Sequence, residues 1–204
     1  CGIDAFIHAE EAYTSTAASP FSDAMAEKAM ELIGENIRRF VANRTDVEAA
    51  EAMMVGSLFA GIAFSFARLG NVHAMSHPVS AFFDVPHGVA NAVLLPVVAE
   101  YNALADHGRY YKIYNYISEI PAYEDEFEPM MLVDAIRSLC KAIGIPANLT
   151  EAINRAGKTG SISRETIEEK IEAMAADAMK SGNIAVNPRS SRQCDIEMLY
   201  RKAL

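Results

Sequence analysis

Apolar residues recur along most of this chain at the three- and four-residue spacing of amphipathic helices. Within the segment 20–42, one helix face would carry Met25, Ala29, Leu32, Ile33, Ile37 and Phe40. The same spacing predicts helices over residues 2–14, 20–42, 47–68, 106–118, 126–143, 149–155 and 192–203, and a surface helix that begins after Ser163 and ends at Gly182. Alternating runs rich in Val and Thr, which would indicate strands, are scarce. The pattern therefore predicts an all-α fold, a single helical domain over residues 1–204.

Two segments, 47–68 and 89–101, are apolar around nearly the whole helix instead of along one stripe. A helix of this kind is usually buried on most sides. We therefore expect 47–68 to be a central core helix, with Gly56 and Gly61 allowing a neighbour to approach closely. Pro96 is expected to kink or end the second segment, because proline removes a helix hydrogen bond.

Capping residues mark several of the predicted helix ends. Pro20 suits the first turn of a helix, because its fixed φ is already helical. Thr45 and Glu48 have the spacing of a capping box at the start of the segment 47–68. Gly144 is expected to close the helix over 126–143.

The charge balance narrows the classes of partner. The chain has 18 Lys and Arg against 27 Asp and Glu, which gives a formal net charge of −9. Such a surface repels nucleic-acid phosphates and anionic lipid, so neither nucleic acid nor a membrane is an expected partner. We expect no membrane span, because no apolar run approaches the roughly 20 residues that one requires. The chain is long enough to bury a substantial core.

The cysteines and the first residues bear on where the chain works and how much of it is present. The three cysteines lack the spacing of a thiolate metal site or a disulfide framework, so we expect a cytoplasmic protein. The sequence begins at Cys1 without an initiator Met and inside a predicted helix. We therefore expect it to be a piece of a longer polypeptide.

The candidate chemistry lies in four of the five histidines. His73 and His77 stand one helical turn apart, as do Asp4 and His8, and His87 follows a proline at a predicted helix start. Side chains one turn apart lie about 6 Å from each other at Cβ, which suits two ligands of one ion. A carboxylate with imidazoles and no thiolate suits Zn(II), Fe(II), Co(II), Ni(II) or Mn(II).

Spacing alone leaves the roles of these residues open. His73 and His77 could both bind an ion, or one could bind while the other carries protons. His107, in a polar turn, has the ordinary interpretation of a hydrogen-bonded histidine. The nearby carboxylates are more often solvated or orienting groups than ligands, and these are Glu10, Glu11 and Asp84.

At these residues the sequence resembles a known family. The segment GNVHAMSHPVSAFFDVPHGVA, residues 70–90, strongly resembles the signature of the iron-containing (group III) alcohol dehydrogenases. The opening GIDAFIHAEEAY, ANAVLLP at 90–96 and NPR at 187–189 are similar to further family segments in the same order. The resemblance covers essentially the whole chain and corresponds to the C-terminal half of the family, the helical domain of the dehydroquinate synthase-like fold.

The resemblance implies a role for each candidate residue. The implied metal ligands are Asp4, His8, His73 and His87. His77 matches the histidine beside the nicotinamide and the alcohol, which makes it a candidate catalytic, cofactor-binding and proton-relay residue. Phe64 matches an aromatic position that lines the substrate pocket in some relatives.

The implied activity is NAD(P)-linked interconversion of a small primary alcohol or diol and its aldehyde. Family habit favours Fe2+ as the metal, with Zn2+ the chief rival. Two alternatives remain: a zinc-dependent enzyme like the glycerol dehydrogenases and dehydroquinate synthases, or a helical metal-binding module without catalysis.

The family's N-terminal dinucleotide-binding domain, with its Gly-rich loop, has no counterpart in these residues. We therefore expect this chain alone to bind metal but to lack activity. We also expect homo-oligomers, because loss of a packed domain would expose an apolar face around the histidines.

Overall fold

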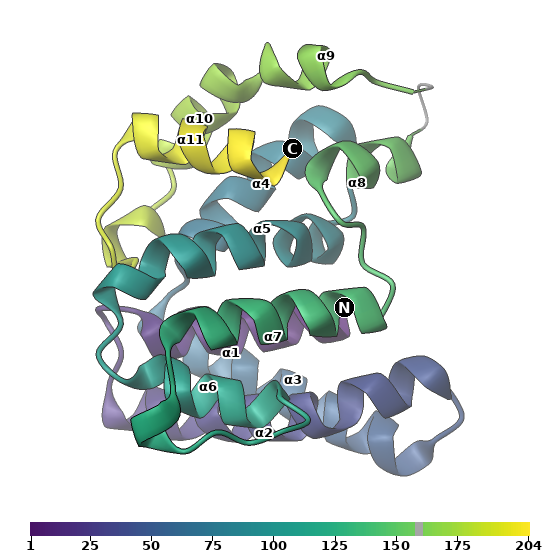
Figure 1. The fold of residues 1–204 in the computed structure, drawn as a ribbon, viewed down its shortest axis with the longest axis vertical. Helices are drawn as coiled ribbons and strands as arrows, with labels where there is room; N and C mark the ends of the chain where they lie inside the picture. Colours follow the sequence, from purple (N-terminus) through teal and green to yellow (C-terminus); the bar gives the residue numbers. More distant parts are fainter. Residues whose placement is uncertain (158–160) are drawn as a thin grey trace.

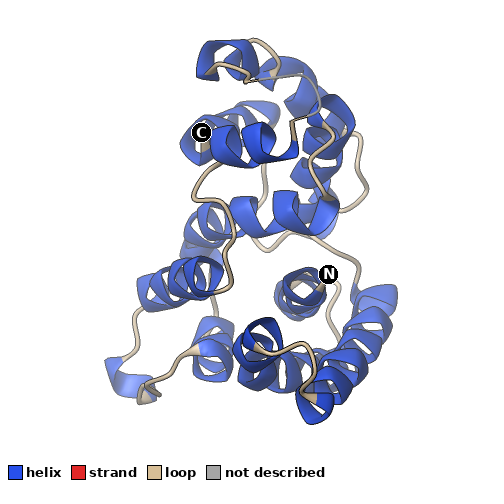
Figure 2. Cartoon of the chain, turned by 90° about the vertical axis from the view of Figure 1, so that its right-hand side faces the viewer, coloured by secondary structure: helices blue, strands red, loops and turns tan. Residues whose placement is uncertain are grey.

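The computed structural model describes residues 1–157 and 161–204. Its fold is built from helices, and no strand occurs in these two ranges. The α-helices are α1 (Gly2–Thr14), α2 (Pro20–Ala42), α3 (Val47–Ala67), α4 (Asn71–Phe83), α5 (His87–Asn102), α6 (Arg109–Ile117), α7 (Pro129–Ala142), α8 (Leu149–Ala156), α9 (Arg164–Glu168), α10 (Ile171–Met179) and α11 (Gln193–Ala203). Short 3-10 turns occupy Ala103–Ala105, Glu124–Glu126 and Ile184–Val186. The predicted all-α class is confirmed (Figure 2).

The helices form two groups with α5 between them. At one end of the molecule α1, α2 and α3 pack against one another, and at the other end α10 packs on α4 and α11 (Figure 1). Helix α5 contacts α1, α4, α7, α8 and α11. The helix that begins at His87 therefore contacts helices of both groups.

The prediction that α3 is a central core helix, buried on most sides, is wrong. Only one face is buried, against α1 and α2, and it consists of Ala49, Met53, Gly56, Ala60, Ala63 and Ala67. On the other face the exposed fractions are 71% for Met54, 62% for Leu58 and 63% for Phe66. Apart from Met53, the buried residues of this face are small, either alanine or glycine.

The two glycines of α3 lie on different faces of the helix and differ in their surroundings. A Cβ added at Gly56 would lie 2.7 Å from Cγ1 of Ile33 in α2, so the predicted close approach exists there. A Cβ at Gly61 would meet nothing within 4 Å among the described residues, so the prediction is wrong for Gly61. Gly61 lies on the open face.

Two helix starts show which capping predictions hold. Pro20 opens the first turn of α2, as predicted, and Ser19 caps the helix. For α3 the predicted cap, Thr45, is wrong by one residue: Asp46 Oδ1 accepts the N–H of Ala49 at 3.0 Å. The Thr45 hydroxyl instead donates to Asn43 Oδ1 at 2.8 Å.

Two further predictions about helix ends can be compared with the structure. Of the two outcomes expected at Pro96, a kink or an end, the end does not occur, because α5 continues to Asn102. Its missing hydrogen bond is offset by burial of the next turn, including Val98 and Ala99. Ser163 does cap a helix, accepting the N–H of Thr166 at 3.3 Å, but the predicted single surface helix is divided into α9 and α10, and α10 buries one face in the core.

Among the described residues, two helices are long and apolar enough to cross a membrane by length and composition: Val47–Ala67, and the stretch His87–Ala105 that contains α5. The expectation that no apolar run approaches this length is therefore wrong by that measure. Core helices of soluble proteins pass the same test, and 56% of the second helix's apolar window is buried against 28% for the first. Length and composition alone do not assign either helix to a membrane.

Candidate metal centre

Helices α1, α4 and α5 bring the four predicted ligands to one place. The ligand atoms of Asp4, His8 and His73 all lie within 4.8 Å of one another. Nε2 of His87 is 3.9 Å from Oδ1 of Asp4, and the rings of His73 and His87 are 5.3 Å apart between centroids. One carboxylate and three imidazoles from three helices therefore converge.

The local sequence explains this convergence. Asp4 and His8 are one turn apart, so they share the face of α1 that meets α4 and α5. His73 lies in the first turn of α4, and His87 is the first residue of α5. A Cβ added at Gly88 would lie 3.2 Å from Cβ of Asp4, so glycine there lets α5 begin close against α1.

Asn91, which sequence reasoning did not single out, lies in the middle of the cluster. Its Nδ2 donates to Oδ1 of Asp4 at 2.6 Å and is 3.0 Å from Nε2 of both His73 and His87. Its own Oδ1 is buried and has no hydrogen-bond partner among the described residues. The sequence carried one signal for Asn91, its spacing: it lies one turn after His87 on the same helix face.

The surroundings of Asn91 Nδ2 test whether the residues suit a cation. Three acceptor atoms, one anionic, point at a group that carries only partial positive charge. This donor set, a carboxylate with imidazole nitrogens, is one that divalent transition metals prefer. The residues present therefore fit a divalent metal ion.

Glu11 orients His73 from the side away from the cluster. Its Oε2 is 2.6 Å from Nδ1 of His73, and its Oε1 accepts the N–H of Val72 at 2.6 Å. A proton on Nδ1 that donates to the carboxylate leaves the Nε2 lone pair facing Asp4. Glu11, one of the carboxylates whose role the sequence left open, thus has the orienting position.

The other two nearby carboxylates lie outside the converging set. Glu10 is buried, and burial together with the charge of Glu11 raises its pKa to about 8. Asp84 is exposed and ends α4 in a left-handed conformation, with φ of 59°.

The histidines of the cluster favour the neutral state. Burial, with the neighbouring His73 next in size, lowers the pKa of His8 to about 4. Burial also lowers the pKa of His87, and burial followed by the charge of His87 lowers that of His77. Neutral imidazole is the form that binds metal, so these shifts favour coordination near neutral pH.

His77 and Phe64 adjoin the cluster without joining its ligand atoms. The ring of His77 is 5.3 Å from that of His87 at an interplanar angle of 18°, and its side chain is exposed. Phe64 of α3 stacks on His8 at 4.7 Å. His107 is exposed in the turn before α6 and is not part of the converging set. The structure thus brings all six predicted site residues into one neighbourhood: Asp4, His8, Phe64, His73, His77 and His87. Of the five histidines, only His107, which was not predicted to be part of the site, lies outside it.

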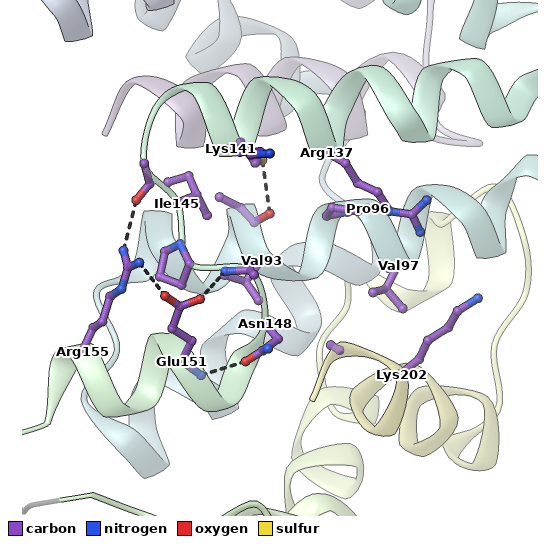
Figure 3. A pocket seen from close by; sticks show the side chains of 16 residues that line it. Val93, Pro96, Val97, Arg137, Lys141, Ile145, Asn148, Glu151, Arg155 and Lys202 are labelled. Atoms are coloured by element: carbon purple, nitrogen blue, oxygen red, sulfur yellow. Dashed lines mark hydrogen bonds and ion pairs between the residues drawn. The ribbon is translucent and has the colours of Figure 1, made fainter.

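A separate cavity lies away from the histidine cluster. It measures about 660 Å³ and is lined by residues of α5, α7, α8, α11 and the segment between α7 and α8 (Figure 3). Several of its polar groups bond one another: Glu151 accepts from Arg155 at 2.5 Å and from the Ala147 N–H at 2.7 Å, and Asn148 Oδ1 accepts the Glu151 N–H at 2.8 Å. None of the clustered histidines lines it, so the candidate site is the histidine cluster and not this cavity.

Comparison with known proteins gives one consistent result. The family model described as "Fe-containing alcohol dehydrogenase family, C-terminal" matches residues 1–204. The 1,3-propanediol dehydrogenase of Citrobacter freundii is 39% identical over 203 residues, which are 99% of this chain and 49% of that protein. The NADPH-dependent butanol dehydrogenase of Clostridium saccharobutylicum is 34% identical, over 98% of this chain and 48% of that protein.

The fold agrees with a solved relative. The crystal structure of a 1,3-propanediol oxidoreductase superposes with a TM-score of 0.86 at 39% identity, covering 100% of this chain and 50% of the other. This chain therefore spans about half the length of the relatives it matches.

Proposed function

This chain belongs to the Fe-containing alcohol dehydrogenase family, and from that premise we propose that it forms the metal-binding half of an NAD(P)-dependent alcohol dehydrogenase. The proposed reaction interconverts a small primary alcohol or diol and its aldehyde. The observation that carries the proposal is the convergence of Asp4, His8, His73 and His87, with Asn91 Nδ2 held at its centre. The proposed ion is Fe2+, with Zn2+ as the alternative.

Asp4, His8, His73 and His87 would hold the ion. A divalent ion bound there supplies Lewis acidity toward an alcohol or carbonyl oxygen. The protein's own contribution is orientation: Glu11 fixes the ring of His73, and Gly88 lets His87 approach Asp4. Because three helices supply the ligands, the site depends on the packing of α1, α4 and α5.

His77 and Phe64 are proposed to act on the substrate side. His77 is exposed and stacks on His87, so it can exchange a proton between the reacting hydroxyl and solvent. Phe64 stacks on His8 and offers an apolar surface for the carbon chain of the alcohol.

The remaining parts of the proposal concern what lies beyond this chain. NAD(P) is proposed to bind between these residues and the half of the relatives that this chain does not span. This chain alone is then expected to lack turnover. A cytoplasmic location and homo-oligomeric assembly remain predictions.

The proposal is tested on the full-length gene product. We expect elemental analysis to find about one divalent ion per chain, and NAD(P)-linked oxidation of 1-butanol or 1,3-propanediol. His73→Ala and His87→Ala should abolish this oxidation, because each removes an implied ligand. His107→Ala is the matched control, since this exposed histidine lies outside the cluster, and it should retain full activity.

Two results would contradict the proposal: a protein without any bound divalent ion, or His73→Ala and His87→Ala variants as active as the parent. Turnover of glycerol or a phosphorylated keto sugar acid in place of short alcohols would favour the zinc-dependent alternative. Metal binding by the full-length product without any turnover would favour a non-catalytic module.

A further inference from the structure

Helix α4, which carries His73 and His77, begins without a capping side chain of its own. Its N-cap is Gly70. The N–H groups of Asn71 and Val72 are buried, and buried backbone N–H groups require partners. Asn187 Oδ1 accepts the first at 3.1 Å and Glu11 Oε1 accepts the second at 2.6 Å. The start of α4 is therefore capped by side chains from two distant segments.

The fit around this helix start is tight. A Cβ added at Gly70 would lie 2.9 Å from Oδ1 of Asn187 and 3.0 Å from Oε1 of Glu11. Both distances are shorter than ordinary contacts, so any larger residue would displace one of the capping groups. Glycine at this position is what allows both caps at once.

Asn187 also connects this helix start to α5. Its Oδ1 accepts a second hydrogen bond from Nδ2 of Asn102, the last residue of α5, at 3.2 Å. Its Nδ2 donates to Oδ1 of Asn102 at 2.8 Å and to the carbonyl of Arg189 at 2.7 Å. All the ordinary hydrogen-bonding capacity of this buried amide is thus used.

The residues that Asn187 bonds lie on the two helices that carry His73 and His87. Asn71 is two residues before His73, and the same first turn of α4 is held by Glu11, which also bonds Nδ1 of His73. Helix α5 carries His87 and Asn91, so a change in how α4 sits on α5 would shift ligands of both helices.

We propose that Asn187 is a positioning residue for the metal centre, which sets the start of α4 against the end of α5 and so fixes His73 relative to His87. The inference rests on the proposed function, because it assigns Asn187 a role in binding the proposed ion. An amide is required at this position. An aspartate keeps the acceptor for Asn71 but replaces both donated bonds by repulsion from the Asn102 and Arg189 oxygens.

The test measures metal binding and not turnover. The affinity for Co2+ is measured by titration, and the visible absorption of bound Co2+ reports the ligand geometry. Asn187→Ala and Asn187→Asp should each lower the affinity about tenfold or more, the usual size of an effect on groups that orient ligands, and should change the Co2+ spectrum.

The matched control is Asn115→Ala. Asn115 also accepts a backbone N–H from a loop, that of Ala122 at 3.0 Å, but belongs to α6, away from the cluster. It should leave Co2+ affinity and spectrum unchanged. If the Asn187 variants keep the parent's affinity and spectrum, Asn187 has only a structural role and the inference is overturned.

Two further outcomes are distinguishable. If the parent protein itself fails to bind Co2+, the proposed function fails first. If the Asn187 variants do not fold, Asn102→Ala replaces them, because it removes the bonds to α5 and leaves the Asn187 bond to Asn71. It should also lower Co2+ affinity, and an unchanged affinity would overturn the inference.

Discussion

Helices α3 and α5 have similar apolar composition and opposite surroundings. By length and composition, α3 and the stretch His87–Ala105 that contains α5 could each span a membrane, yet 56% of the apolar window in the second is buried and only 28% of that in α3. Helix α5 is covered by five other α-helices of this chain, whereas α3 packs mainly on α1 and α2. Apolar composition thus predicts that a helix is buried, but it does not predict which neighbouring elements bury it.

The open face of α3 carries several large apolar side chains. Met54, Leu58 and Phe66 are exposed on it, and Phe21 of α2 packs edge-on against Phe66 at 5.0 Å. Serines lie among them, at Ser57 and Ser65. The buried face of the same helix is lined mostly by alanine and glycine, which explains why apolar content alone misplaced it.

The largest expected difference between the two helices is in the cost of removing a leucine. Leu94 of α5 is fully buried, so Leu94→Ala should lower the free energy of unfolding by about 2–5 kcal/mol through lost contacts and a cavity. Leu58→Ala on α3 should change it by less than about 0.5 kcal/mol, because Leu58 is 62% exposed. Urea unfolding followed by circular dichroism measures both, and equal losses would contradict the comparison.

Alanine substitutions at the two glycines of α3 should change the stability by smaller amounts and in opposite directions. Gly56→Ala forces a Cβ against Ile33 and should destabilise by about 1–3 kcal/mol. Gly61→Ala meets open space and should stabilise by up to about 1 kcal/mol, since alanine favours the helix more than glycine does. Thermal unfolding measures both signs. A stabilising Gly56→Ala would mean that the α2–α3 contact is looser than described.

The cap of α3 gives the smallest of the three effects. Asp46→Ala removes the acceptor for the Ala49 N–H and should cost about 1 kcal/mol. Thr45→Ala is the control and should cost less, because Thr45 does not cap the helix. The reverse order in chemical denaturation would restore the cap predicted from sequence.

The sequence predicted the parts of the molecule that depend on local pattern. Asp4 with His8, and His73 with His77, are pairs one turn apart, and the resemblance distinguished the roles within the second pair. The position of Asn91 one turn after His87 indicates a neighbour of that residue, but its contacts with Asp4 and His73 depend on how α5 lies against α1 and α4. Asn187 acts on Asn71 across 116 residues of chain, and no periodicity encodes that contact.

The open face of α3 was missed for a related reason. A fully apolar helix predicts burial, but burial by this chain's own residues depends on how many helices the rest of the chain places around it. For α5 the chain supplies five, and for α3 the described residues leave one face open.

The most direct test of the account is calorimetric titration of the metal-free protein with Zn2+, compared between the parent, His73→Ala and His107→Ala. We predict one tight site per chain in the parent and in His107→Ala, and loss of at least tenfold in affinity in His73→Ala, because His73 faces the other ligands and His107 lies outside the cluster. Equal binding by all three proteins, or no binding by the parent, would contradict the assignment of the histidine cluster as a metal centre.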